Sequence, residues 1–85
     1  MTWNHRVIRH ETHVTNYGIE VWFGIHECYY DHSEDEIPQG WTDKAIAPMG
    51  DTVAELMESI QQCKAALDKP ILMIEGDHLK VWQPE

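Results

Sequence analysis

Hydrophobic residues recur at helical spacing over residues 52–68, and this is the clearest pattern in the chain. The apolar positions form one stripe that contains Val53, Leu56, Met57, Ile60, Cys63 and Leu67. Thr52 with Glu55 is typical of a capping box, in which each side chain accepts from the other residue's backbone N–H. Pro70 disfavours helical geometry before it, so the helix ends there. We predict one amphipathic helix of about four turns.

Segments rich in β-forming residues precede this helix and predict three strands. The first covers residues 4–11, which are polar apart from Val7 and Ile8 and therefore half-buried at most. The second covers residues 19–30, whose side chains alternate between the two sheet faces, and a hairpin loop over residues 12–18 precedes it. The third, irregular strand covers residues 41–47 and ends at a proline. Gly24 inside the second strand indicates a bulge or a close approach of another backbone.

A short apolar segment, residues 71–74, follows the helix and predicts a C-terminal strand, and residues 79–82 form a further strand or an ordered tail. The predicted fold is one α+β domain over residues 1–85. It is a three-stranded antiparallel meander, one amphipathic helix packed on one sheet face, and a short C-terminal strand. A right-handed crossover places that strand parallel to the first, in the order 3-2-1-4. The open sheet face and the edges favour a homodimer or partner docking.

The charge balance narrows the classes of partner. The 85 residues carry 15 acidic against 6 basic side chains, a net charge of −9. Such a chain repels phosphate backbones and anionic membranes, and it favours a basic protein partner; the simpler alternative is that acidity only maintains solubility. Residues 1–6 lack the apolar core of a signal peptide, and two cysteines make no disulfide framework. We expect a cytoplasmic protein with reduced thiols.

Chemistry-bearing motifs are sparse. His26 and Cys28 share a strand face and could supply two zinc ligands, but a structural zinc site needs four. No phosphate-binding loop or nucleophile elbow is present. We expect no enzymatic activity, no cofactor and no metal. A small metal-binding protein or enzyme that uses His26 and Cys28 is the alternative.

Function by surface remains. An acidic turn follows the second strand, and large aromatic residues, which often anchor interfaces, lie near it in the sequence. The predicted partner-binding residues are Trp22, Tyr30, Asp31, Glu34, Asp35, Glu36 and Trp41. We expect a non-enzymatic inhibitor or adaptor that occludes a basic, nucleic-acid-handling protein. A homo-oligomeric domain with a housekeeping role is a further alternative.

Two resemblances accompany this interpretation. The segments 3–9, 24–31, 48–56 and 66–72 resemble an uncharacterised family of short bacterial and phage proteins, which implies no activity. The Pro38-Gln39-Gly40 turn, followed by Gly50-Asp51-Thr52 and Glu55 at a helix start, is similar to the HicB-like antitoxin core. That resemblance implies a partial ribonuclease H-like β-β-β-α-β fold and the neutralisation of a small ribonuclease toxin. An anti-CRISPR or other phage anti-defence role fits the same acidity.

Overall fold

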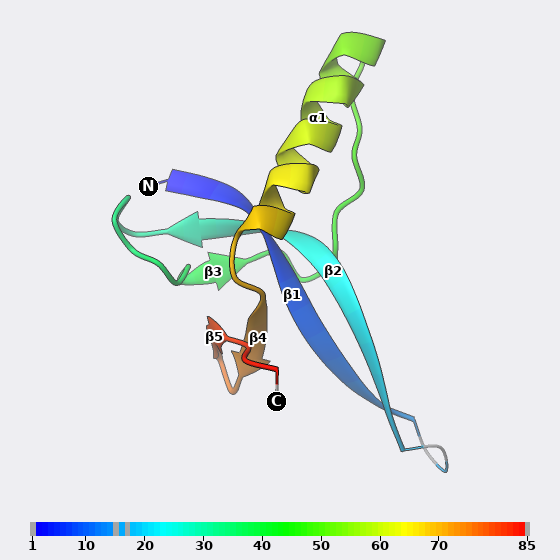
Figure 1. Ribbon diagram of the computed structural model, residues 1–85, viewed down its shortest axis with the longest axis vertical. Coiled ribbons are helices and arrows are strands. Elements are labelled where there is room, and N and C mark those ends of the chain that lie inside the picture. The colour runs from blue at the N-terminus through cyan, green and yellow to red at the C-terminus, as the bar shows by residue number, and fades with distance from the viewer. Residues whose placement is uncertain (1, 15, 17, 85) are drawn as a thin grey trace.

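The chain forms an α+β fold, as predicted, in a computed structural model that describes residues 2–14, 16 and 18–84 (Figure 1). Its elements are β1 (Thr2–Val14), β2 (Gly18–Tyr30), β3 (Gly40–Trp41), α1 (Val53–Ala65), the short 3-10 helix η1 (Ala66–Asp68), β4 (Leu72–Glu75) and β5 (His78–Val81). Within the described residues, no helix has the length and apolar character needed to cross a bilayer.

The five strands form one mixed sheet in the order β3-β2-β1-β4-β5, so the predicted three-stranded antiparallel meander is wrong. β4 pairs parallel with β1 on one side and antiparallel with β5 on the other. The predicted neighbour order 3-2-1-4 is present within this sheet. The prediction treated residues 79–82 as strand or tail, whereas pairing with β4 through a turn at Gly76 makes His78–Val81 a full member of the sheet.

β1 and β2 form a long two-stranded ribbon that extends beyond the rest of the sheet (Figure 1). Their pairing continues to Val14 opposite Gly18, so the first part of the predicted 12–18 loop is strand. Residues 15 and 17 of that loop lie outside the described residues. Gly24 stays in register with Ile8, which excludes a bulge there. A Cβ at Gly24 would lie 2.9 Å from the Ala45 Cβ, so side chains, and not the predicted backbone, approach this position closely.

The third strand is shorter than predicted. β3 contains two residues, and the chain then follows β2 as far as Ile46 through isolated backbone hydrogen bonds, from Thr42 N–H to the Glu27 carbonyl and from Ile46 N–H to the Ile25 carbonyl. Pro48 lacks the N–H that a continuing ladder would need. The segment leaves the sheet edge and leads up to the start of α1 (Figure 1).

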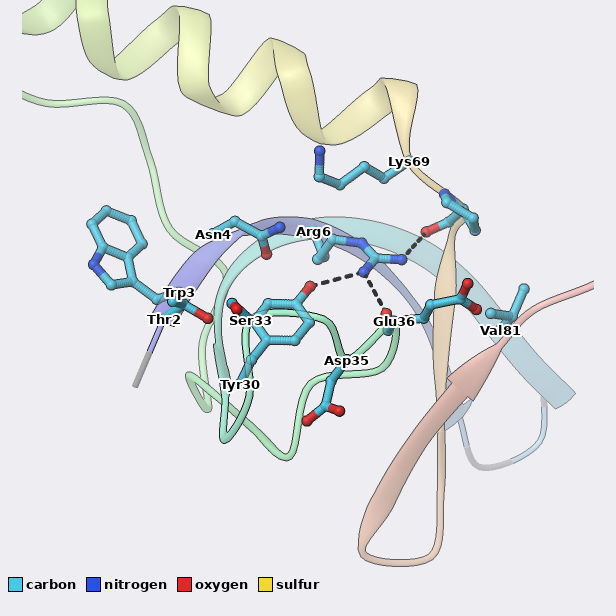
Figure 2. Close-up of a pocket in the computed structure, with 11 residues that line it drawn as sticks. Thr2, Trp3, Asn4, Arg6, Tyr30, Ser33, Asp35, Glu36, Lys69 and Val81 are labelled. Carbon is cyan, nitrogen blue, oxygen red and sulfur yellow. Dashed lines mark hydrogen bonds between the residues drawn. The ribbon is translucent and has the colours of Figure 1, made fainter.

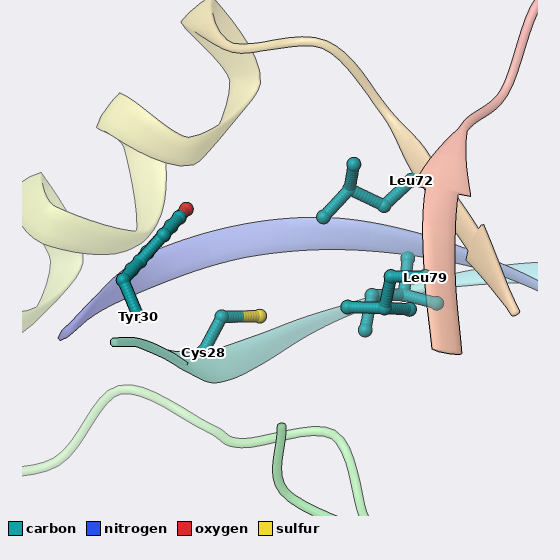
Figure 3. Close-up of a cluster of buried hydrophobic side chains, with 5 residues drawn as sticks. Cys28, Tyr30, Leu72 and Leu79 are labelled. Atoms are coloured by element: carbon teal, nitrogen blue, oxygen red, sulfur yellow. The ribbon is translucent and has the colours of Figure 1, made fainter. Parts of the chain in front are cut away.

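The hydrophobic core lies between the β4–β5 pair and the part of the β1–β2 ribbon that contains Ile8, Cys28 and Tyr30 (Figure 3). Its buried members are Ile8, Cys28, Tyr30, Leu72 and Leu79, with the partly buried Ile37, Trp41 and Val81 packed against them. This core includes residues from both ends of the chain. β1 is therefore the central strand and is much more buried than its polar sequence predicts, with His5, Arg6, Val7 and Ile8 all buried.

The predicted packing of the helix on a sheet face is wrong. α1 contacts the sheet mainly through β1, near its C-terminal end, where Cys63 is buried, and the rest of the helix projects away from the strands (Figure 1). Val53, Met57 and Ile60 remain 74%, 57% and 48% exposed. The helix itself starts as predicted: Thr52 caps it by accepting from the Glu55 N–H, while the Glu55 carboxylate accepts from Asp51 N–H instead of Thr52 N–H.

Candidate functional site

The acidic segment 31–36, called the acidic loop below, follows β2 and is held in one conformation by local hydrogen bonds. His32 N–H donates to the Asp35 carboxylate at 3.2 Å, and Asp35 N–H donates to the His32 carbonyl at 3.1 Å. At the start of the loop, Asp31 N–H donates to the Gln39 side-chain oxygen at 2.7 Å. The loop is therefore ordered before any partner arrives, which lowers the entropic cost of binding.

Arg6 fixes the far end of this loop (Figure 2). Its Nη1 donates to the Tyr30 hydroxyl at 2.8 Å and to the Glu36 carbonyl at 3.0 Å, and its Nη2 donates to the Pro70 carbonyl at 2.9 Å. The residue is 4% exposed, and within the described part of the chain no carboxylate forms an ion pair with it. One guanidinium thus joins β1, the end of β2, the acidic loop and the segment before β4.

A pocket of about 510 Å³ opens over this guanidinium. The acidic loop contributes Ser33, Asp35 and Glu36 to its wall, while Lys69 and Pro70 close the opposite side (Figure 2). Asn4 also lines the pocket, and its side-chain oxygen is buried without a hydrogen-bond partner, as is the Nε of Arg6. The pocket brings two cations and two carboxylates together around one cavity.

The predicted partner-binding residues separate into three groups. Asp31, Glu34 and Glu36 are exposed and Asp35 is partly exposed, so the acidic loop presents its carboxylates together. Tyr30 is buried, and Trp41 is partly buried and packs against the core. Trp22 lies eight residues before Tyr30 on β2, about 26 Å away along the strand.

Among the described residues, no carboxylate of the acidic loop forms an ion pair, although Arg6 and Lys69 line the neighbouring pocket. The described residues form ion pairs only at Arg9–Glu11, Asp77–His78 and Glu75–Lys80, all outside the loop. Within the loop, the Glu34 carboxylate accepts only from the Ser33 hydroxyl, at 3.4 Å. The loop is therefore a source of negative potential on a chain whose net charge is already −9.

Trp22 belongs to a second polar cluster on the ribbon. Its indole stacks on the His10 ring with centroids 4.0 Å apart, and His10 Nε2 lies 2.9 Å from His26 Nε2. His26 is fully buried, and its Nδ1 donates to the Thr42 carbonyl at 2.8 Å. Because a carbonyl only accepts, His26 Nε2 carries no proton in the neutral ring and accepts from His10 Nε2–H.

We expect this histidine pair to make the protein less stable in mild acid. Burial lowers the pKa of His10, and the neighbouring His26 lowers it further. A lowered pKa in the folded state means that the unfolded chain binds the proton more readily. The contribution of neutral His10 to the free energy of unfolding is therefore complete above about pH 6.5, the usual histidine pKa, and it is lost as the pH falls from there toward the lowered pKa. The melting temperature should fall as the pH is lowered from 7.5 to 5.

The matched variants for this measurement are His10→Gln and His13→Gln. His10→Gln should flatten the fall in melting temperature below pH 6.5, because the titrating ring is gone. His13 is an exposed residue on the same strand, so His13→Gln should retain the wild-type pH profile. Equal profiles for the wild type and His10→Gln would contradict the assignment.

The structure also places the residues of the metal alternative. His26 uses both ring nitrogens in the hydrogen bonds described above, and Cys28 lies in the core. Burial raises the pKa of the Cys28 thiol to about 11, which disfavours the thiolate that binds metals. Among the described residues, no three His, Cys, Asp or Glu side chains gather as a metal site.

Sequence reasoning missed Arg6, which determines the shape of the site. The residue stands in a polar stretch of β1, and its three acceptors lie 24, 30 and 64 residues away. Only the central position of β1 in the sheet would have indicated that an arginine there must find buried acceptors.

No family model, curated protein or solved structure matches this chain.

Proposed function

We propose that the chain is a non-enzymatic binding protein that occludes a basic, nucleic-acid-handling protein partner, as an antitoxin or a phage anti-defence protein does. The observation that carries this proposal is the acidic loop, whose ordered carboxylates form no ion pair among the described residues. Carboxylates on an ordered scaffold complement a basic groove of the partner that otherwise binds phosphates. Their negative potential also accelerates the association of this chain with the partner.

The experiment is a pull-down from the native host lysate with three baits, read by mass spectrometry. One bait is the wild type. The second neutralises the loop with Asp31→Asn, Glu34→Gln, Asp35→Asn and Glu36→Gln. The control neutralises the same number of exposed carboxylates elsewhere, with Glu20→Gln, Asp43→Asn, Glu58→Gln and Asp77→Asn. The three baits then differ in where the charge is removed.

A basic protein should bind the wild type at low salt and dissociate at high salt, because screening weakens exposed ion pairs. The loop-neutralised bait should capture about tenfold less of this protein or even less, because each of the four lost ion pairs contributes a few tenths of a kcal/mol to binding. The control bait should capture nearly as much as the wild type. Equal loss with both neutralised baits would assign binding to net charge and contradict a role for the loop.

A further inference from the structure

The chain exposes more surface than a monomer of its mass normally does. Its accessible area is 6399 Å², whereas folded monomers of 9.9 kDa expose about 5,200 Å². Its radius of gyration is 14.1 Å, against about 12 Å for a compact chain of this length. The excess area, about 1,200 Å², exceeds the roughly 800 Å² that each partner buries in a standard interface.

Two exposed apolar surfaces lie at opposite ends of the molecule (Figure 1). One is the helix stripe, formed by Val53, Leu56, Met57 and Ile60 on α1. The other is the ribbon patch, formed by Ile19, Val21 and Phe23, which alternate along β2 and so share one sheet face. Trp82 contacts the edge of Phe23, with ring centroids 5.8 Å apart, yet Phe23 stays half exposed.

We propose that two copies of this chain form a symmetric dimer in which the helix stripe of each copy covers the ribbon patch of the other. An amphipathic helix and a half-apolar sheet face are the surfaces that normally cover each other within one domain. Here the two are separated along a molecule whose longest extent is 44 Å (Figure 1). A two-fold axis across the long dimension places each helix end beside the partner's ribbon end, and it forms the same contact twice.

This dimer uses surfaces other than the acidic loop, so it stands independently of the proposed function. Salt also has opposite effects on the dimer contact and on the binding of a basic partner. Two chains of charge −9 repel each other, so screening strengthens an apolar association between copies. Binding of a basic partner through the acidic loop weakens with salt.

The test is the mass in solution at 100 µM, measured by light scattering after size exclusion, with circular dichroism as the check on folding. The wild type should have twice the 9.9 kDa chain mass and keep it in 0.5 M NaCl. Ile60→Glu and Val21→Lys should each give a folded monomer. Ala54→Glu, which adds the same charge on exposed α1 surface outside the stripe, should remain a dimer.

Mixing the two monomeric variants tests the arrangement itself. In a mixed dimer, one helix–ribbon contact pairs the new glutamate with the new lysine, and the other contact is entirely wild type. An equimolar mixture of Ile60→Glu and Val21→Lys should therefore recover the dimer mass. A monomeric wild type, a dimeric single variant or a mixture that stays monomeric would each overturn the proposal.

Discussion

Leu72→Ala is expected to lower the free energy of unfolding by about 2–5 kcal/mol, the range for a fully buried leucine that leaves a cavity. Leu72 has no exposed surface and lies in the core on β4, opposite Ile8 of β1 and Val81 of β5 in the sheet; Figure 3 shows it near Leu79. A domain of this size has about 5–15 kcal/mol of stability at most. The melting temperature should fall by about 8 °C or more, at about 4–8 °C for each kcal/mol.

Leu67→Ala is the matched control, because it removes the same atoms from a leucine that is 67% exposed on η1. Its melting temperature should stay within a few degrees of the wild type. Thermal denaturation followed at 222 nm measures both variants. Similar losses for the two leucines would mean that the core does not lie where β4 meets β1.

Arg6→Met is expected to cost about 1–3 kcal/mol, because the buried Tyr30 hydroxyl loses its donor, whereas water can replace the donor at the part-buried Glu36 and Pro70 carbonyls. The methionine fills part of the space but donates nothing to Tyr30, Glu36 or Pro70. Amide hydrogen exchange across residues 31–36 should accelerate together with the fall in melting temperature, since the loop loses its attachment to β1.

Arg9→Met provides the comparison on the same strand. Arg9 pairs with the exposed Glu11 and lies over the Trp82 ring, 5.2 Å from its centroid, so its loss should cost about 1 kcal/mol or less. Exchange in the acidic loop should be unchanged in this variant. If Arg6→Met and Arg9→Met melt alike, the three hydrogen bonds of Arg6 contribute little to the fold.

Local signals predicted the parts of this fold that local interactions form. The Thr52 cap depends on residues three positions apart, and it is present as expected. The exposure of the acidic loop follows from its composition, which leaves no apolar side chain to bury between residues 31 and 36. The alternation along β2 likewise identified a strand whose described bounds differ from the prediction by one residue.

Contacts between distant residues accounted for the errors. The helix stripe showed that α1 has an apolar face, but a periodic pattern does not identify the surface that covers this face. β3 failed to extend because the chain must leave the sheet to reach the projecting helix. Arg6 could not be assigned from its neighbours, since every group that it binds arrives from elsewhere in the sequence.

The parallel pairing of β1 with β4 has a consequence for how the protein is made. Ile8 emerges from the ribosome more than 60 residues before its core neighbours Leu72 and Leu79. Until then the central strand has an unpaired edge and an incomplete core. The core therefore cannot close before β4 and β5 are made, and a premature stop before residue 71 would release a chain exposing the β1 edge to chaperones and proteases.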